Sequence, residues 1–422
     1  MRKKFHVISV ILFIILVLGS VAVTSAAAKE QKPVEEIKLT AEKPVANAQF
    51  GRSVAIDGDL VAVGEGGDGA VGAVYLYKRQ GQMYVPDAKL ESPDPLPETC
   101  TGIPGTTGTC PEFGRTVAIQ GNTVFVGARF APVAGLNAGA VYVFRKHSDV
   151  WQVEDKIVSP SPQNEDNFGR ALAIQGNVLV VTARKEKLGA MDVGAAYVFA
   201  YKDGGWKFQT KLTASDPAPG AYFGQSVALQ GNLIAIGARN ADPNGAGAVY
   251  LFRNSGEDWT QVARVAPSDG KTDDQYGFTV AISGNTMTVG SRRADPDGLT
   301  DAGAVYVYSL KRDSADLVTR LTPGDARAGD EFGQSVAFAG DVIAVGAWKD
   351  DIGDSADQGS VYLFRRAGGQ WAETGKITAT DGVAGDEFGY SLAAFGDRMV
   401  TGAHFADAKA GVAYVLPAKP LH

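Results

Sequence analysis

The chain has 422 residues, with 52 glycines, only 19 prolines and 45% hydrophobic residues. This composition excludes a collagen-like or disordered chain and indicates many tight turns between packed strands. The 40 basic and 47 acidic residues give a net charge of −7, a poor match for nucleic acid, so we expect no nucleic-acid partner. Only four histidines are present, which argues against His-based metal or acid–base chemistry.

Residues 1–28 have the features of a secretory signal peptide. Arg2, Lys3 and Lys4 precede an apolar run at 7–18, and small residues at 24–28 end in Ala26-x-Ala28. An uncleaved anchor helix is the alternative, because the apolar stretch is near the shortest length that spans a bilayer. We expect a secreted protein, extracellular or periplasmic or held at the cell surface, with no membrane span after signal cleavage.

Cys100 and Cys110 are the two cysteines of the chain, and they lie ten residues apart. Export makes a disulfide between them the favoured state. Their spacing matches no metal-binding pattern.

The rest of the chain, 29–422, is a sevenfold repeat. An aromatic residue followed by glycine recurs every 53 to 63 residues, and the longest interval contains the segment between the two cysteines. The aromatic residues of the seven copies are Phe50, Phe113, Phe168, Phe223, Tyr276, Phe332 and Phe388. A fixed period of this size indicates a repeat architecture.

Each copy reads as four short strands. A first apolar run leads to Gly-Asn or Gly-Asp, a two-residue hairpin signal, as at Gly231-Asn232. A second run follows, then a variable polar loop, and a third run begins with a Gly-Ala-Val-Tyr-like sequence, as at Gly247 to Tyr250. A fourth run has an aromatic residue five positions before a basic one. No sustained helical periodicity is present. We therefore predict an all-β, seven-bladed β-propeller of four-stranded antiparallel blades.

Ring closure is predicted from the two ends of the repeat array. The seventh copy stops after its third strand, at Tyr414 to Leu416, and residues 36–39 near the start have the character of a fourth strand. We expect this N-terminal strand to complete the last blade, which would hide two exposed strand edges.

The repeats resemble the FG-GAP repeats of integrin alpha subunits, and more closely those of bacterial extracellular repeat proteins. Phe-Gly, Val-Gly-Ala and Gly-Ala-Val-Tyr carry the resemblance over about 35–416. It implies the propeller fold and an interaction role, although propellers have many functions. Integrin-type repeats often have a calcium loop between the first two strands. Here that connection is two residues long and has no room for such a cation site.

In an antiparallel meander, successive connections alternate between the two ends of the sheet. The loops between second and third strands and the connections between copies share one end, which we call the loop face (239–246 and 266–275 in the fourth copy). The opposite end, the turn face, has only short turns. Variable loops on a rigid scaffold tend to bind ligands, so the loop face is the expected interaction surface.

A repeated arginine opens the loop after the second strand in four copies. The four residues are Arg129, Arg184, Arg239 and Arg292. They could form a ring that binds an anionic ligand, since guanidinium groups suit carboxylate or sulfate. Alternatively, they pair with the acidic residues two positions before the aromatic residue, which are Asp166, Asp274, Asp330 and Asp386.

A second candidate site is Asp295, Asp297 and Asp301, whose spacing matches the tail of a calcium loop. The alternatives are a calcium site and a solvated acidic turn, and no other cofactor is expected.

The fourth-strand tryptophans, Trp151, Trp206, Trp259 and Trp371, suggest packing between blades, with sugar stacking as the alternative. No catalytic motif is present, so we do not expect an enzyme. The expected function is a monomeric binding scaffold for an extracellular protein or glycan. The alternatives are a lectin-like propeller and a polysaccharide-active enzyme at the channel mouth.

Overall fold

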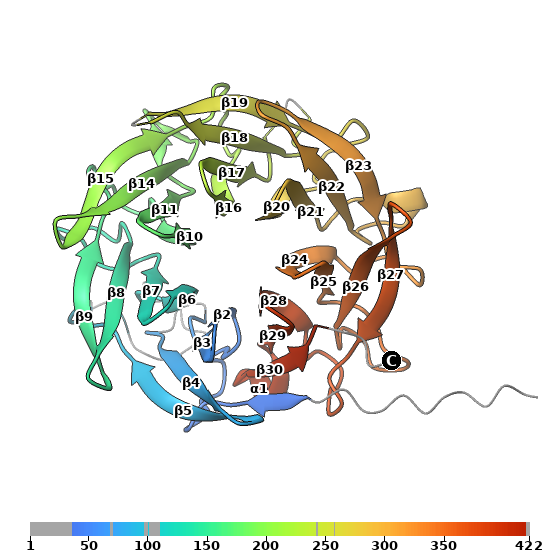
Figure 1. Cartoon of the computed structure of the whole chain (residues 1–422), viewed down its shortest axis with the longest axis horizontal. Helices are drawn as coiled ribbons and strands as arrows, with labels where there is room; N and C mark the ends of the chain where they lie inside the picture. Colours follow the sequence, from blue (N-terminus) through green and yellow to red (C-terminus); the bar gives the residue numbers. More distant parts are fainter. Residues whose placement is uncertain are drawn as a thin grey trace, which may run out of the picture. The chain divides into compact units, whose positions relative to one another are not determined.

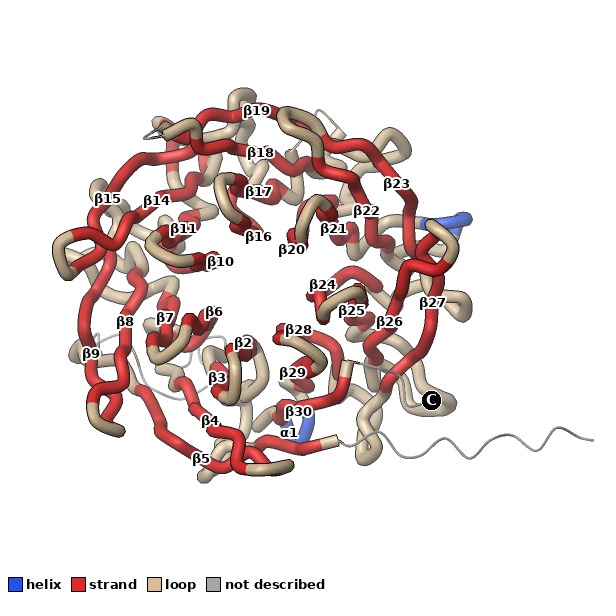
Figure 2. Tube along the Cα trace, in the orientation of Figure 1, coloured by secondary structure: helices blue, strands red, loops and turns tan. Residues whose placement is uncertain are grey.

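The computed structural model describes residues 36–67, 71–96, 100, 110–241, 244–256 and 258–418. Seven four-stranded antiparallel sheets are arranged as blades around a central channel, as Figures 1 and 2 show. The predicted fold class is thereby confirmed. The predicted signal peptide at 1–28 lies outside the described residues. Among the described residues, no helix has the length and apolar character needed to cross a membrane.

Each blade runs outward from the channel in sequence order, and blade 7 ends with the N-terminal strand. The innermost strands are β2 (Ser53–Asp57), β6 (Phe113–Gln120), β10 (Phe168–Gln175), β16 (Phe223–Gln230), β20 (Tyr276–Ser283), β24 (Phe332–Ala339) and β28 (Phe388–Phe395). The second strands are β3 (Leu60–Gly64), β7 (Thr123–Ala128), β11 (Val178–Ala183), β17 (Leu233–Ala238), β21 (Thr286–Ser291), β25 (Val342–Ala347) and β29 (Arg398–Ala403). The third strands are β4 (Val74–Gln80), β8 (Ala140–His147), β14 (Ala195–Lys202), β18 (Ala248–Asn254), β22 (Ala304–Leu310), β26 (Ser360–Ala367) and β30 (Val412–Pro417). The outer strands are β5 (Met83–Leu90), β9 (Val150–Ile157), β15 (Gly205–Leu212), β19 (Trp259–Val265), β23 (Ala315–Leu321), β27 (Gln370–Ile377) and β1 (Ile37–Leu39).

Short elements decorate the loop face. The hairpin of β12 (Lys187–Leu188) and β13 (Met191–Asp192) lies in the loop of blade 3. A 3₁₀ turn, η1 (Pro296–Gly298), and one helical turn, α1 (Ala406–Lys409), occupy the same loop of blades 5 and 7. The turn face has the predicted two-residue hairpins, whose glycines have φ between 57° and 62°. Positive φ favours glycine, which explains why it recurs there.

The repeated aromatic residue anchors the core between neighbouring blades. All seven rings are at most 1% exposed. Phe113, for example, meets the third-strand Tyr142 at a ring-centroid distance of 5.4 Å. The glycine that follows is required by close packing, because a Cβ on Gly114 would lie 2.5 Å from the carbonyl oxygen of Ala73 in the neighbouring blade. In blade 5 the aromatic residue is Tyr276, and its hydroxyl donates a hydrogen bond to the hydroxyl of Tyr308.

Side-chain hydrogen bonds link successive innermost strands. In six of the seven blades, the hydroxyl two positions after the aromatic-Gly glycine donates to the carbonyl of the corresponding glycine in the next blade, as Thr116 does to Gly169 at 2.8 Å. Near the turn face, glutamines at the end of innermost strands bond both ways with the next turn. Gln120 donates to the carbonyl of Gly176 and accepts from its N–H. These contacts hold the blades at a fixed spacing.

The ring is closed by the N-terminal strand, as predicted. β1 pairs antiparallel with β30, with Lys38 opposite Tyr414. Leu39 is 3% exposed and belongs to the core shared by blades 7 and 1. Lys38 Nζ lies 2.7 Å from Asp381 Oδ2, and the Tyr414 hydroxyl donates to Asp381 Oδ1.

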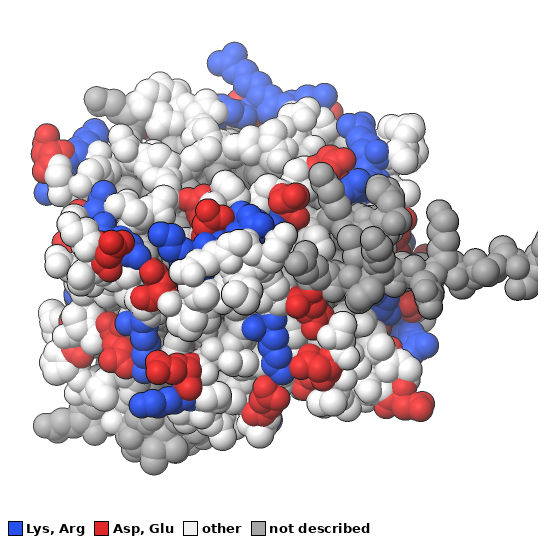
Figure 3. Space-filling view, turned by 60° about the horizontal axis from the view of Figure 1, so that its bottom comes forward, with Lys and Arg blue, Asp and Glu red and all other residues white. Residues whose placement is uncertain are grey.

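The same arrangement of base, acid and tyrosine recurs on other blades. In blade 6, for example, Lys376 of β27 pairs with Asp325 of the connection entering the blade, and the Tyr362 hydroxyl donates to Asp325. The basic residue at the repeated fourth-strand position therefore fastens the incoming connection to the outer strand. Figure 3 shows acidic and basic side chains next to one another along the outer wall near β1 and β5.

The fourth-strand tryptophans pack between blades. Trp206 of blade 3 packs against Phe125 of blade 2 with a ring-centroid distance of 5.5 Å. The indole N–H of Trp151 in blade 2 donates a hydrogen bond to Asp87 of blade 1. Trp259 is 8% exposed. Their recurrence is thus explained by packing. The structure also contains the disulfide between Cys100 and Cys110, at the entry to blade 2.

Candidate functional site: the channel mouth

The innermost strands place one residue of each copy around the channel, directly after the repeated glycine. We call this ring the inner tier, and its members in blade order are Arg52, Arg115, Arg170, Gln225, Phe278, Gln334 and Tyr390. They line a cavity of about 300 Å³ together with the two residues that follow each of them. Blades 1 to 3 therefore supply three arginines on one side, and blades 4 to 7 supply amides and aromatic rings on the other.

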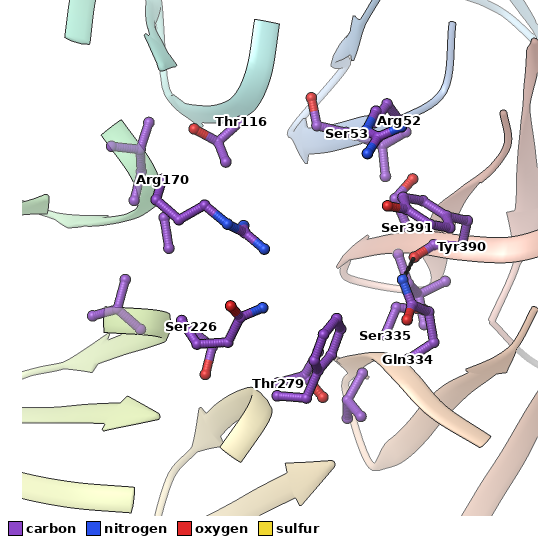
Figure 4. A pocket seen from close by; sticks show the side chains of 18 of the residues that line it. Arg52, Ser53, Thr116, Arg170, Ser226, Thr279, Gln334, Ser335, Tyr390 and Ser391 are labelled. Carbon is purple, nitrogen blue, oxygen red and sulfur yellow. Dashed lines mark hydrogen bonds between the residues drawn. The ribbon is translucent and has the colours of Figure 1, made fainter. Parts of the chain in front are cut away.

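Figure 4 shows Arg170 reaching from blade 3 toward the middle of this cavity, with Gln334 and Tyr390 on the far side. Below the inner tier, the cavity wall is aliphatic in every blade. The residues of this collar are Val54, Val117, Leu172, Val227, Val280, Val336 and Leu392. The cavity is thus polar at its mouth and apolar deeper in.

The position directly after the second strand in blades 2 to 7, together with the equivalent Gly66 two residues after β3, forms an outer tier. Its members in blade order are Gly66, Arg129, Arg184, Arg239, Arg292, Trp348 and His404. The four predicted arginines therefore lie on consecutive blades, 2 to 5, at the loop face. The tiers are in contact, because Arg184 donates to Gln225 Oε1 at 3.0 Å and Arg292 donates to Gln334 Oε1 at 3.0 Å. Arg292 also stacks over Phe278, 4.0 Å from the ring centroid.

Two of the four outer-tier arginines are ion-paired. Arg129 Nε lies 2.6 Å from Glu112 Oε2, and Arg292 Nη1 lies 3.1 Å from Glu331 Oε2. Both carboxylates are almost fully buried. Arg184 and Arg239 instead flank the ring of Tyr222. Their guanidinium carbons lie 5.5 and 4.9 Å from the ring centroid. Neither has a carboxylate partner within the part of the chain that the structure describes.

The predicted pairing of these arginines with Asp166, Asp274, Asp330 and Asp386 is wrong. Each of these carboxylates accepts a hydrogen bond from the backbone N–H three residues earlier, as Asp330 does from Arg327 at 2.7 Å. They fix the turn that enters the blade. The acids that pair with arginine, Glu112 and Glu331, come one position later, directly before the aromatic residue.

Seven arginines gather at the channel mouth and shift the pKa of several groups there. Burial and the charges of Arg184, Arg115 and Arg129 hold the pKa of Arg170 well below its ordinary value. Burial and the charges of Arg129, Arg239 and Arg115 lower the pKa of Arg184 to about 9. Burial raises the pKa of Tyr390, but Arg52, Arg115 and Arg170 outweigh it, so that the net shift is downward. For Tyr390 the neighbouring arginines outweigh burial, which indicates a positive potential at this side of the mouth.

Blades 6 and 7 contribute a buried neutral cluster beside the arginines. His404 is 1% exposed, and its ring packs at a tilt against Tyr390 with a centroid distance of 3.8 Å. Burial, with Arg52 and Arg115 nearby, holds the pKa of His404 well below its ordinary value. Burial raises the pKa of Glu387 to about 8, so this carboxyl is largely protonated at neutral pH. The cluster therefore does not neutralise the arginines.

The three aspartates of the calcium prediction lie together in the loop of blade 5. Asp295 Oδ1 accepts from the backbone N–H of Asp301, and Asp297 lies 3.5 Å from Arg320. Within the described residues, no three acidic, histidine or cysteine side chains are arranged to hold a metal ion. Calcium binding here stays a prediction for titration.

Sequence reasoning missed the inner tier. Its signal was present: three of the seven aromatic-Gly pairs are followed directly by arginine, at Arg52, Arg115 and Arg170. Aligning the copies and asking which position faces the channel would have found it.

The comparisons with known proteins agree with this architecture. The profile of the FG-GAP repeat matches seven segments, 33–77, 109–144, 151–199, 206–252, 259–308, 316–364 and 371–416. A search of curated proteins found no match. Among solved structures, Saccharomyces cerevisiae Sqt1 is similar in fold, with a TM-score of 0.51 and 10% identity over 92% of this chain and 87% of that one. Because the matched segments cover most of the sequence, the chain belongs to the FG-GAP repeat family.

Proposed function

We propose that this protein is a secreted binding scaffold that recognises acidic groups of an extracellular protein on its loop face. The repeat propeller itself supports an interaction role. The observation that carries the proposal is the gathering of seven arginines in two tiers at the channel mouth. The members are Arg52, Arg115, Arg129, Arg170, Arg184, Arg239 and Arg292.

Clustered guanidinium groups are costly for the fold unless they serve a ligand. Like charges at short range repel, and partial burial removes the water that would screen them. Guanidinium groups match carboxylates with paired hydrogen bonds, so an acidic partner would relieve this repulsion. The chain as a whole is acidic, so the gathering of seven arginines at the channel mouth is a local feature.

The repeated tryptophans no longer support the alternative of a glycan ligand. The fourth-strand tryptophans pack between blades, as Trp206 does on Phe125, and do not form a surface for sugar rings. An acidic glycan would still match the arginines, and the experiment below separates it from a protein.

Selection of phage-displayed random peptides tests the proposal. We expect peptides rich in Asp and Glu to be enriched on the wild-type protein and to lose binding to R184Q/R239Q. A control with the same change in charge, R312Q/R366Q, alters two exposed arginines of the turn face and should keep binding. Peptides without acidic residues, or peptides that bind R184Q/R239Q equally well, would contradict the proposal. So would binding confined to sulfated or uronic glycans on a glycan array.

A further inference from the structure

We propose that the inner tier holds a single oxyanion group of the ligand, a carboxylate, sulfate or phosphate, between Arg52, Arg115 and Arg170. This inference rests on the proposed function and assigns a deeper subsite to it. The outer tier would then contact the surroundings of that group on the loop face.

Three consecutive blades each place an arginine at the same side of the cavity. Arg52, Arg115 and Arg170 occupy the same position of three neighbouring copies and line one side of a cavity of about 300 Å³. Arg170 reaches into the opening (Figure 4), and its Nε is buried without a hydrogen-bond partner among the described residues. A buried donor without a partner costs stability, and an oxyanion would supply the acceptor.

The opposite side of the cavity is lined by two glutamines, Gln225 and Gln334. The side-chain oxygens of Gln225 and Gln334 already accept hydrogen bonds from Arg184 and Arg292. The remaining polar atoms of both amides are therefore N–H donors, and Gln334 Nε2 already uses one N–H to donate to the Tyr390 carbonyl at 3.5 Å. Both sides of the mouth thus offer donors, which selects against cations and favours an acceptor-rich group.

The aliphatic collar limits how deep a charged ligand can enter the channel. The aliphatic collar begins directly below the inner tier, with Val54, Val117 and Leu172 under the three arginines. A charged group would lose its hydration there without gaining partners. The oxyanion therefore stays at the level of the arginines.

The charges that act most strongly on Arg170 are those of other arginines. Burial, together with the charges of Arg184, Arg115 and Arg129, keeps its pKa well below the ordinary value. Replacing Arg170 by a neutral residue should therefore remove the subsite and stabilise the fold, as is common where function requires strained electrostatics.

The experiment is calorimetric titration with citrate, sulfate and phosphate at constant ionic strength, paired with a thermal melt of each variant. Wild-type protein should bind at least one of these probes, and R170Q should weaken that binding by at least about tenfold. The control R312Q changes an exposed arginine and should bind like wild type. R170Q should melt at or above the wild-type temperature.

Each other outcome overturns the inference. Binding of none of the probes, equal binding by R170Q, or equal loss in R312Q would show that the inner tier is not an oxyanion site. A lower melting temperature of R170Q would assign Arg170 a structural role. The proposed function fails separately, when acidic peptides bind R184Q/R239Q as well as wild type. Preference for citrate over sulfate and phosphate would identify a carboxylate source, and the reverse a sulfated or phosphorylated one.

Discussion

Residues 171 and 182 of blade 3 exchange the chemical roles that their counterparts have in the other blades. Elsewhere a serine or threonine of the innermost strand faces a glycine or a small residue of the second strand. A Cβ on Gly127, for example, would lie 2.2 Å from Thr116 Oγ1. In blade 3 the innermost strand has Ala171 and the second strand has Thr182, whose hydroxyl accepts from the backbone N–H of residue 171 at 3.0 Å. The missing glycine of the third copy is therefore a paired substitution.

This pairing predicts strong coupling between the two positions. A171S alone should destabilise the protein by about 1–3 kcal/mol, because the new hydroxyl meets the Thr182 side chain. T182G alone should also destabilise it, through loss of the hydrogen bond and added chain entropy. A171S/T182G restores the common arrangement, with the introduced hydroxyl free to donate to the carbonyl of Gly224. Urea denaturation should show a coupling of about 0.5–3 kcal/mol, and additive effects would refute the pairing.

A second prediction at the residue scale concerns the aspartates that fix the blade-entry turns. Burial raises the pKa of Asp166 and of Asp330 to about 6. The folded protein therefore binds more protons than the unfolded chain, and stability should fall as the pH rises from about 4 to about 6. D330N keeps an acceptor for the backbone N–H of Arg327 but no longer titrates. Thermal melts between pH 4 and 7 should show a shallower decline for D330N than for wild type. An identical decline would contradict the raised pKa.

At the scale of single elements, the three-residue strand β1 closes the ring. It covers the edge of β30, supplies Leu39 to the core between blades 7 and 1, and brings Lys38 to Asp381. Residues 36–39 were assignable as a strand from sequence because they repeat the spacing of a fourth strand. The lysine completes the same contact that Lys376 makes with Asp325 in blade 6.

Two truncated proteins test this role. One begins at residue 36 and keeps β1, and the other begins at residue 41 and lacks it. The free energy of unfolding of the shorter protein should be lower by about 2–5 kcal/mol, since Leu39 is nearly fully buried and the β30 edge becomes exposed. Differential scanning calorimetry would measure the change, with the longer protein as control. Equal melting temperatures would show that the ring does not depend on strand closure.

At the scale of the whole molecule, the sequence repeat and the structural blade are out of step by one strand. The matched segment 151–199, for example, contains β9, the outer strand of blade 2, followed by three strands of blade 3. Each sequence repeat thus bridges two blades, and the last blade must be completed by the first segment. The covalent chain itself reinforces the ring.

This repetition explains what the sequence could predict. Seven copies of the aromatic-Gly pair, the turn glycine and the third-strand tyrosine define the strands because each copy confirms the others. The channel mouth differs between copies: the inner tier has Arg170 in blade 3 and Phe278 in blade 5. Its composition follows no repeat, and its convergence depends on closure of the ring. The outer-tier arginines were found, but their partners were misassigned by one residue, because strand register decides which acid faces them.

The central claim is that the mouth of the channel binds an oxyanion. A crystal structure of the protein soaked in selenate, with anomalous data at the selenium edge, tests it most directly. We predict an anomalous peak at the inner tier, within hydrogen-bonding distance of Arg170 and of Arg52 or Arg115. Peaks found only at lattice contacts or on the outer wall, with the channel mouth empty, would contradict the claim.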